Sequence, residues 1–385
     1  MSSRDRVEAA LRHEEPDRIP LNMSLTLDAY VNLRRHLGME FDPTATVDRL
    51  SEVRPAQDLI ARLGIDITYL RLRGVPPRHD IEPLTEGGRV DEWGVEHGDI
   101  RLPSGSSLTE VVHSPLEGLA SDEIDLDSLV WPDAADPRRV DGLEAEARRL
   151  SSDTDLALLG RFGGPILETA FYLRGYQNWM MDLAAEPEFA RSLLERVADV
   201  MIDLDAAGIR AAGPYLSILR VSGEDLGMQQ RALFSPATWR DVIRPVLSRR
   251  WKAARALLDE VAPHVRLLLH SDGSFSEYIP DLLEDGIDVL DPMQVHLPGM
   301  GADDLKREFG DRLSFHGGID TQQYLPFRSE EEVRAETERC IYALGPGGGY
   351  ILGPVHNVQP DVPPQNLVAM VETLHRAGRY PLPTS

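Results

Sequence analysis

The sequence predicts a distorted closed (β/α)₈ (TIM) barrel with a hairpin region inserted after the second strand. Short aliphatic or β-branched runs alternate with longer amphipathic helical patterns along the 385 residues. The short runs are apolar on both faces, as parallel strands between layers of helices are. Eight strand-then-helix units are the number found in a closed barrel. The alternative fold is a doubly wound open sheet. We therefore expect a single barrel domain over residues 1–385.

Each predicted strand is a run of five or seven residues between helical or turn-rich segments. In chain order the expected strands are 18–24, 66–72, 156–160, 215–221, 266–270, 287–291, 313–317 and 350–354. The clearest helix signals lie in the segment 235–262, where Ser235 is a predicted N-cap and Pro236 the first helical residue. Pro245 within that segment predicts a kink or a break.

Residues 75–150 form the predicted insertion between the second and third strands. The stretch EGGRVDEWGVEHGDIRLPSG alternates like a β-hairpin, and the acidic stretch SDEIDLDSLVWPDAADPRR that follows is typical of a loop. The insertion follows the end of a strand, which is the catalytic side of a barrel. We expect it to lie over the barrel mouth as a lid or a wall.

Composition and charge exclude several classes of protein. The 40 basic and 64 acidic residues leave a formal charge of −24, which disfavours nucleic acid and anionic membranes as partners. The charged first residues do not resemble a secretory signal, and no apolar run is long enough to span a membrane, so we expect a cytoplasmic protein. The single cysteine, Cys340, excludes an internal disulfide and a multi-cysteine zinc cluster, and its helical setting favours packing.

Three polar side chains after two predicted strands form a candidate metal site. His270 ends the fifth predicted strand, Asp272 follows two residues later, and His356 follows the last strand. The carboxyl ends of barrel strands share one mouth, so these side chains are expected to meet there. Two imidazoles and a carboxylate suit a divalent ion with an open position, and zinc is the first choice, ahead of iron or manganese. The alternative is that the histidines form hydrogen bonds without any metal.

Other polar residues near predicted strand ends are candidates for catalysis or substrate binding. Asp225 is the preferred general acid, although an aspartate before a helix is often only an N-cap. Glu168 is expected to reach the cleft, whereas Arg174 on the same helix is expected to be structural. The candidates for substrate binding, with core hydrogen bonding as the alternative, are Asn22, Gln229, Gln294, His316, Asp320 and Asn357.

Several longer motifs resemble the uroporphyrinogen decarboxylase superfamily over nearly the whole chain. They are RVEAALRHEEPDRIPL, FGGPILETAFYLRGYQNWMMDLAAEPEFARSLLERV, GEDLGMQQRALFSPATWRDVIRP, LLLHSDGSFSEYIPDLLEDGIDVLDPMQ, LKREFGDRLSFHGGIDTQQYLP and GGGYILGPVHNVQPDVPPQN. The superfamily includes heme-pathway decarboxylases and cobalamin-dependent methyltransferases. The resemblance implies a distorted (β/α)₈ barrel with its active cleft at the carboxyl ends of the strands.

Within this superfamily, the sequence resembles the methyltransferase branch more than the true decarboxylases. The decarboxylases carry an RQAGRY-like arginine cluster after the first strand, but the stretch LNMSLTLDAY stands there in this chain. Without such cations, nothing in this acidic protein would neutralise the several carboxylates of a porphyrinogen. His356 falls where the decarboxylases have a histidine, so a decarboxylase remains the second interpretation.

The zinc-dependent methyltransferases of the superfamily have an H-x-C pair at the fifth strand end and a further cysteine near the last strand. Here these positions are His270, Asp272 and His356, which would make a harder zinc site than one with thiolates. The resemblance implies methyl transfer between a corrinoid protein and a pterin, such as tetrahydrofolate, or a methoxylated or methylamine-type molecule. The alternative that is not an enzyme is a protein that binds a small ligand in the same barrel mouth.

Overall fold

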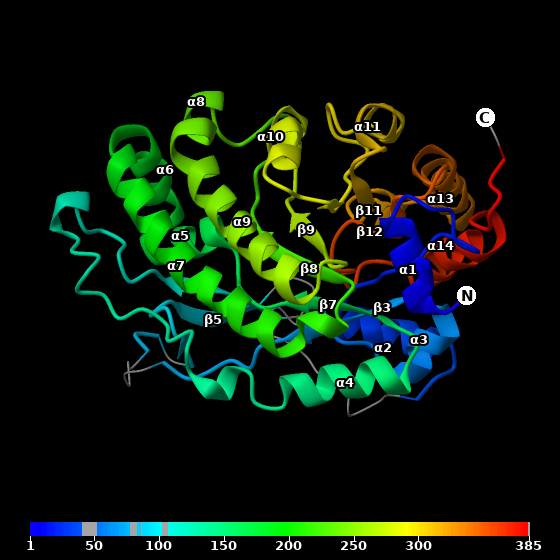
Figure 1. The fold of residues 1–385 in the computed structure, drawn as a ribbon, viewed down its shortest axis with the longest axis horizontal. Coiled ribbons are helices and arrows are strands. Elements are labelled where there is room, and N and C mark those ends of the chain that lie inside the picture. The colour runs from blue at the N-terminus through cyan, green and yellow to red at the C-terminus, as the bar shows by residue number, and fades with distance from the viewer. Residues whose placement is uncertain (41–51, 78–82, 86, 102–106, 384–385) are drawn as a thin grey trace.

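The computed structural model contains a parallel seven-stranded sheet that curls around a common interior (Figure 1). The structure describes residues 1–40, 52–77, 83–85, 87–101 and 107–383. The strand order is β12-β11-β10-β9-β8-β7-β3. The bounds are β3 (Ile67–Arg71), β7 (Ala157–Arg161), β8 (Ile218–Gly223), β9 (Arg266–His270), β10 (Val289–Asp291), β11 (Ser314–Ile319) and β12 (Tyr350–Pro354). Seven of the predicted strands are therefore confirmed, within a few residues.

The first predicted strand, 18–24, is not a regular strand, but it closes the barrel. Leu21 forms an isolated parallel bridge with Leu352 of β12, and its carbonyl accepts a hydrogen bond of 2.9 Å from the N–H of Asp66. The segment thus lies between β12 and the start of β3. Pro20 has no N–H to donate, so a regular ladder cannot run through this segment. The result is the distorted barrel that the sequence predicts.

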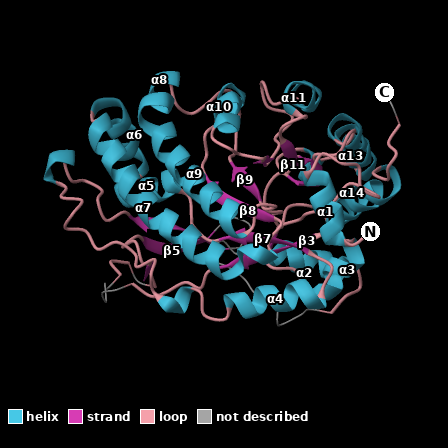
Figure 2. Cartoon of the chain, in the orientation of Figure 1, coloured by secondary structure: helices cyan, strands magenta, loops and turns pink. Residues whose placement is uncertain are grey.

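Helices surround the curled sheet on its outer side (Figure 2). The α-helices are α1 (Ser3–Leu11), α2 (Leu27–His36), α3 (Gln57–Leu63), α4 (Leu143–Asp153), α5 (Ile166–Arg174), α6 (Tyr176–Ala185), α7 (Pro187–Ala212), α8 (Pro236–Thr238), α9 (Arg244–Val261), α10 (Ile279–Glu284), α11 (Ala302–Phe309), α12 (Tyr324–Phe327), α13 (Glu330–Leu344) and α14 (Pro364–Ala377). Among the described helices, none combines the length and the apolar character needed to cross a bilayer.

The segment 235–262 shows how sequence signals set helix bounds. The Ser235 hydroxyl accepts a hydrogen bond from the N–H of Thr238, so the predicted N-cap is confirmed. A π-helical turn, Trp239–Ile243, then separates α8 from α9. Pro245 cannot donate to the carbonyl four residues earlier, which explains why the helix is interrupted just before it.

The inserted region contains a small antiparallel sheet of β4 (Arg89–Val90), β5 (Glu96–Arg101) and β6 (Ser107–His113). The predicted hairpin, residues 86–105, corresponds to the antiparallel pairing of β4 with β5, and β6 adds a third strand beyond it. Parts of the predicted insertion, 78–82, 86 and 102–106, lie outside the described residues.

The Arg174 side chain donates a 2.6 Å hydrogen bond to the Leu116 carbonyl and pairs with Asp182 at 2.6 Å. Arg174 is therefore structural, as expected, and ties α5 to the insertion.

Cys340 is buried on α13, and its sulfur lies 3.5 Å from the carbonyl oxygen of Gly318 on β11. The predicted packing role is confirmed.

Two short strands, β1 (Leu25–Thr26) and β2 (Glu52–Val53), pair antiparallel next to α2.

Candidate active site

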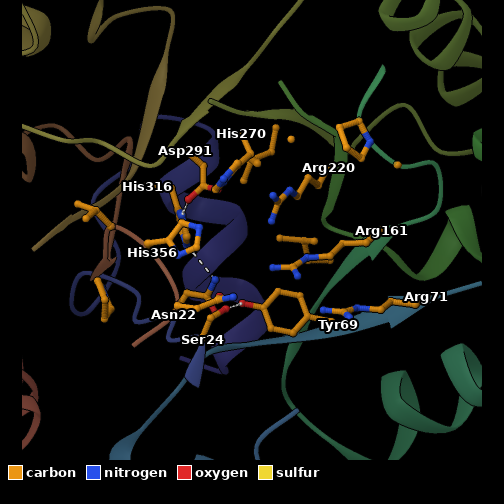
Figure 3. Close-up of a pocket in the computed structure, with 18 of the residues that line it drawn as sticks. Asn22, Ser24, Tyr69, Arg71, Arg161, Arg220, His270, Asp291, His316 and His356 are labelled. Carbon is orange, nitrogen blue, oxygen red and sulfur yellow. Dashed lines mark hydrogen bonds and ion pairs between the residues drawn. The ribbon is translucent and has the colours of Figure 1, made fainter. Parts of the chain in front are cut away.

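A cavity of about 280 Å³ opens at the carboxyl ends of the barrel strands. Its lining comes from residues 22–24, from β3, β7, β8, β9, β10 and β11, from the end of β12 and the segment after it, and from the start of α5 (Figure 3). This is the end of the barrel that the sequence predicts for the site. The volume is near the lower end of the roughly 300–1,000 Å³ found for small-molecule sites.

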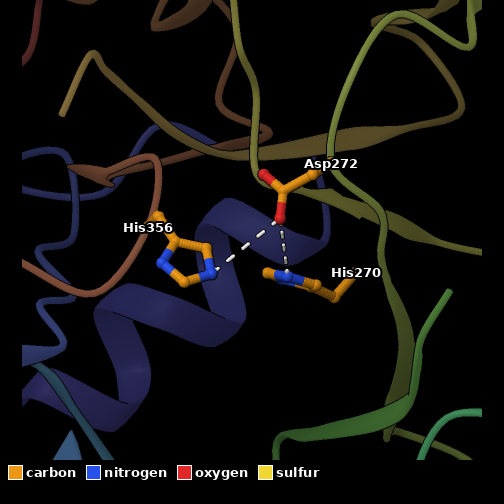
Figure 4. Close-up of side chains that lie close together, drawn as sticks. All are labelled: His270, Asp272 and His356. Atoms are coloured by element: carbon orange, nitrogen blue, oxygen red, sulfur yellow. Dashed lines mark ion pairs between the residues drawn. The ribbon is translucent and has the colours of Figure 1, made fainter. Parts of the chain in front are cut away.

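The structure brings the three predicted metal ligands together at this cavity (Figure 4). His270 ends β9, Asp272 follows two residues later, and His356 follows β12. One potential ligand atom from each of the three residues lies within 4.8 Å of the others. Asp272 Oδ2 is 3.5 Å from His270 Nε2 and 3.9 Å from His356 Nε2. We call these residues the His/Asp/His group.

A close crossing of two loops holds Asp272 in place. The N–H of Gly227, after β8, donates to the Asp272 carbonyl at 3.1 Å. Gly273 has a φ of +89°, and a Cβ there would lie 2.2 Å from the Gly227 carbonyl carbon. Only glycine therefore fits position 273. Gln294 accepts a 2.5 Å hydrogen bond from the Gly273 N–H and does not line the cavity, so this predicted substrate ligand instead positions the loop.

Asp291, at the end of β10, connects two of the cavity histidines. Its Oδ2 lies 2.5 Å from His270 Nδ1, and its Oδ1 accepts a hydrogen bond from His316 Nδ1. Burial alone would raise the pKa of Asp291, but the two imidazoles hold it well below the usual range. With Nδ1 of His270 engaged, its Nε2 faces Asp272, which is the orientation that a metal ligand needs.

A chain of hydrogen bonds fixes the tautomer of His316. Asn22 Oδ1 accepts from the Met23 N–H at 3.0 Å and from the Tyr69 hydroxyl at 2.9 Å. Asn22 Nδ2 therefore faces His316 Nε2, at 2.9 Å, and donates to it. His316 is thus the Nδ1–H tautomer, with its proton toward Asp291. Asn22 and His316 both line the cavity, and their role as substrate ligands stays a prediction.

Glu168 lines the cavity from the first turn of α5 and accepts a hydrogen bond from the Tyr172 hydroxyl. Burial is the main reason that the pKa of Glu168 is raised, so this side chain is suited to holding a proton. Glu224 fixes the helix start, because its carboxylate accepts from the backbone N–H groups of Ile166 and Leu167, both at 2.7 Å. Burial raises the pKa of Glu224 to about 7.

The remaining predicted residues have mixed positions. Asn357 lines the cavity. Asp225 is exposed beside the mouth, and its carboxylate accepts from the Asp272 N–H at 3.3 Å, so it caps the neighbouring loop instead of a helix. Gln229 is exposed and is not among the described residues that line the cavity. Asp320 accepts from the N–H groups of Gln322, Gln323 and Tyr324, so the structure gives it a turn-capping position outside the cavity lining.

Three arginines that sequence reasoning missed also line the cavity: Arg71 on β3, Arg161 on β7 and Arg220 on β8. We call them the arginine row. Their presence corrects the expectation that the site has no cations to meet an anionic substrate. The cations come from three separate strands instead of one segment after the first strand. The signal available in the sequence was an arginine at or next to the end of three predicted strands, 66–72, 156–160 and 215–221.

Comparison with known proteins identifies the family. Residues 117–377 match the family model described as uroporphyrinogen decarboxylase (URO-D). The chain belongs to the uroporphyrinogen decarboxylase family. The uroporphyrinogen decarboxylase of Alkalilimnicola ehrlichii is 26% identical over 262 residues, or 66% of this chain and 67% of that protein. The enzyme of Serratia proteamaculans is 25% identical over 239 residues, or 59% of this chain and 61% of that one.

A solved structure described as a methyltransferase from Methanosarcina mazei has the same fold. It superposes with a TM-score of 0.66 and 17% sequence identity, covering 98% of this chain and 99% of that chain. Membership of the uroporphyrinogen decarboxylase family and the barrel fold, both expected from the sequence, are therefore confirmed. In this chain, His270 and His356 of the His/Asp/His group line the same cavity as the arginine row (Figure 3).

Proposed function

We propose that this protein is a methyltransferase that moves a methyl group between a small molecule or a pterin and a corrinoid protein. The observation that carries the proposal is the His/Asp/His group, whose ligand atoms lie within 4.8 Å of one another beside a small cavity. The similarity in fold to a protein described as a methyltransferase is consistent with it. In this proposal the corrinoid protein docks over the barrel mouth, and the protein works in the cytoplasm.

The donor set of the His/Asp/His group fits zinc. Imidazole and carboxylate are both zinc ligands, and three protein ligands are the usual number in a catalytic zinc site. The hydrogen bond from His270 Nδ1 to Asp291 matches the carboxylate contact that orients many metal-bound histidines. When bound, zinc would supply a Lewis acid that polarises the methyl donor or lowers the pKa of the acceptor.

The other cavity residues would position the substrate and move a proton. In the direction from donor to corrinoid, the methyl–oxygen or methyl–nitrogen bond breaks and the methyl group goes to the cobalt of a Co(I) corrinoid. The donor leaves as an anion or amine that takes up a proton. Glu168 is the proposed proton donor, because burial raises its pKa and it lies in the cavity. Asp225, at the mouth, is the second proposed acid.

Metal content and cobalt spectroscopy test the proposal together. We expect about one zinc per chain in protein purified without chelator, and loss of that zinc in His270→Ala. His264→Ala is the matched control, because His264 contacts the Leu216 carbonyl away from the cavity lining. With methyl donors and cob(I)alamin, the expected signal is the spectrum of methylcobalamin. Metal-free protein that regains no methyl transfer on zinc addition would contradict the proposal.

A decarboxylase is the second candidate, and the arginine row is the observation that favours it, since it supplies cations for carboxylates. The size of the cavity argues against a tetrapyrrole, because about 280 Å³ is small even for a drug-sized ligand. The test is incubation with uroporphyrinogen and measurement of released CO₂. Release at a rate comparable to a true decarboxylase would make this the function.

A further inference from the structure

Helix α5 carries Glu168 into the cavity and is held at both of its ends. At its start, the Glu224 carboxylate accepts from two backbone N–H groups of the first turn, both at 2.7 Å. Near its end, the N–H of Leu116 in the insertion donates to the Leu173 carbonyl at 2.9 Å, and Arg174 donates to the Leu116 carbonyl. The backbone that carries Glu168 is therefore fixed between the loop after β8 and the insertion.

Tyr172 lies one helical turn after Glu168, and residues four apart are neighbours on one face of a helix. The Tyr172 hydroxyl donates a hydrogen bond to Oε1 of Glu168. A protonated carboxyl group accepts through its carbonyl oxygen and carries its proton on the other oxygen. With Oε1 as the acceptor, the proton of the acid form belongs on Oε2.

The insertion also contacts Tyr172 directly. The ring of His97 on β5 packs edge to face with the Tyr172 ring, with the centroids 6.4 Å apart and 86° between the planes. Nε2 of His97 lies 2.9 Å from Oδ2 of Asp91, in the turn between β4 and β5. A region outside the barrel sheet thus helps to set the direction of the Tyr172 hydroxyl.

Several charged or titratable groups act on Glu168 from α5, from β8 and the loop after it, and from β9. They are Tyr172, Arg220, Glu224, Asp225 and His270. Burial is the main reason that the pKa of Glu168 is raised, and the charge of Asp225 raises it further. The hydrogen bond from Tyr172 is the largest of the effects that lower this pKa. The ion pairs of His270 are with other carboxylates, at 3.5 and 2.5 Å, so it acts on Glu168 from a longer distance.

We propose that Tyr172 is the positioning residue of the proton donor: its hydroxyl directs Glu168 so that Oε2 carries the proton toward the methyl donor, and the insertion holds Tyr172 in place. In the reaction the Oε2–H bond breaks, and the proton goes to the oxygen or nitrogen that loses its methyl group. The hydrogen bond from Tyr172 stabilises the carboxylate that remains, which then regains a proton from water. The positioning stands on the geometry, whereas the use of the proton rests on the proposed function.

Infrared difference spectroscopy on the full chain tests the positioning without any methyl transfer. The probe is the carboxylic acid band that Glu168→Gln removes, followed against pH in the wild-type protein and in Tyr172→Phe at equal zinc content. Because the lost donor favours the charged form, the pH at which Glu168 loses its proton should rise by about one pH unit. The frequency of the band should also rise, since the carbonyl loses its hydrogen bond. An unchanged midpoint and frequency would overturn the proposal.

Tyr215→Phe is the matched control, because the Tyr215 hydroxyl accepts from Arg148 away from the cavity lining. It should leave the midpoint and the frequency unchanged. Phenylalanine at position 172 keeps the ring that packs on His97, and thermal unfolding shows that each variant is folded.

His97→Ala tests the part of the insertion. Loss of the ring contact should loosen Tyr172 and raise the midpoint of Glu168 in the same direction as Tyr172→Phe, but by less. A midpoint that stays at the wild-type value in His97→Ala would overturn the part assigned to the insertion.

The pH profile of methyl transfer tests the use of the proton. The protonated form of Glu168 is the active one, so activity falls as the pH rises through its pKa. In Tyr172→Phe this fall should move up by about one pH unit, while kcat below it drops about 10-fold and KM stays unchanged. A loss of activity that is equal at every pH would overturn the proposal in favour of a merely structural tyrosine.

The two measurements separate this inference from the proposed function. A wild-type protein without methyl transfer rejects the proposed function, whereas the infrared titration still decides the positioning of Glu168. Methyl transfer that is unaffected by Glu168→Gln overturns the use of the proton and leaves the methyltransferase standing.

Discussion

Asp291 is the residue on which the geometry of the cavity histidines depends. One carboxylate accepts hydrogen bonds from Nδ1 of both His270 and His316, so it sets the tautomer and the ring orientation of each. Nε2 of His270 is then directed to Asp272, and Nε2 of His316 accepts from Asn22. A single side chain thus connects the proposed metal ligands to the wall of the substrate cavity.

We expect Asp291→Asn to lower zinc affinity by about 10- to 100-fold, as loss of such an orienting carboxylate typically does. An amide keeps one oxygen and adds an NH₂ group that cannot accept, so only one imidazole retains its hydrogen bond. Competition with a chromophoric chelator measures the affinity. Asp311→Asn, at a largely exposed side chain, is the control and should have no effect. Unchanged affinity in Asp291→Asn would show that His270 needs no orienting partner.

At the scale of elements, strand register and loop crossings place the functional side chains. Register sets Arg71, Arg161 and Arg220 side by side, and it also sets His270 opposite Asp291. The loops after β8 and β9 cross at Gly227 and Gly273, where the backbones are too close for any side chain. This crossing fixes the position of Asp272 relative to the end of β9.

We expect Gly273→Ala to destabilise the fold by at least about 3 kcal/mol, because it adds a backbone clash to the strain of a positive φ. Gly286→Ala is a matched control: its φ is +88°, nearly equal to +89° at Gly273, but no atom lies within 4 Å of the added Cβ. The control should cost about 1 kcal/mol. Urea unfolding measures both. Equal losses would mean that the loops separate easily and that the crossing does not hold Asp272.

At the scale of the whole molecule, one buried carboxylate joins the segments that close the barrel. Asp66 is fully buried before β3 and accepts from Arg6 of α1 at 2.6 Å, from Arg18 at 2.8 Å and from the Leu21 N–H at 2.7 Å. The first segment therefore stays between β12 and β3 although it lacks a regular ladder. The cluster compensates for the ladder hydrogen bond that Pro20 cannot donate.

We expect Asp66→Asn to lower the free energy of unfolding by about 3–5 kcal/mol, as removal of one partner from a buried ion pair does. Arg6 and Arg18 would be left without their buried carboxylate. Asp141→Asn breaks the exposed pair with Arg73 and should cost less than about 1 kcal/mol. Chemical denaturation of both variants is the measurement. A loss in Asp66→Asn no larger than in the control would mean that the barrel closes without this cluster.

Local patterns in the sequence were sufficient for most of the fold. Seven strands lie where apolar runs predict them, since a strand buried on both faces needs such a run. Ser235 and Pro245 set a helix start and a helix break, because capping and the missing N–H are properties of those residues alone. Residues 18–24 were predicted as a strand but form no regular strand, because their place in the barrel depends on Asp66 and on contacts with β12.

By itself, the sequence determined the fold class, the family and the meeting of His270, Asp272 and His356, because residues after parallel barrel strands always share one mouth. Only the tertiary structure decided which polar side chains enter the cavity. Gln294 and Asp320 accept hydrogen bonds from nearby backbone N–H groups and stay outside the cavity lining. The register of neighbouring strands places Asp291 and the arginine row in the cavity. Register is a relation between segments far apart in the chain, so no local pattern contains it.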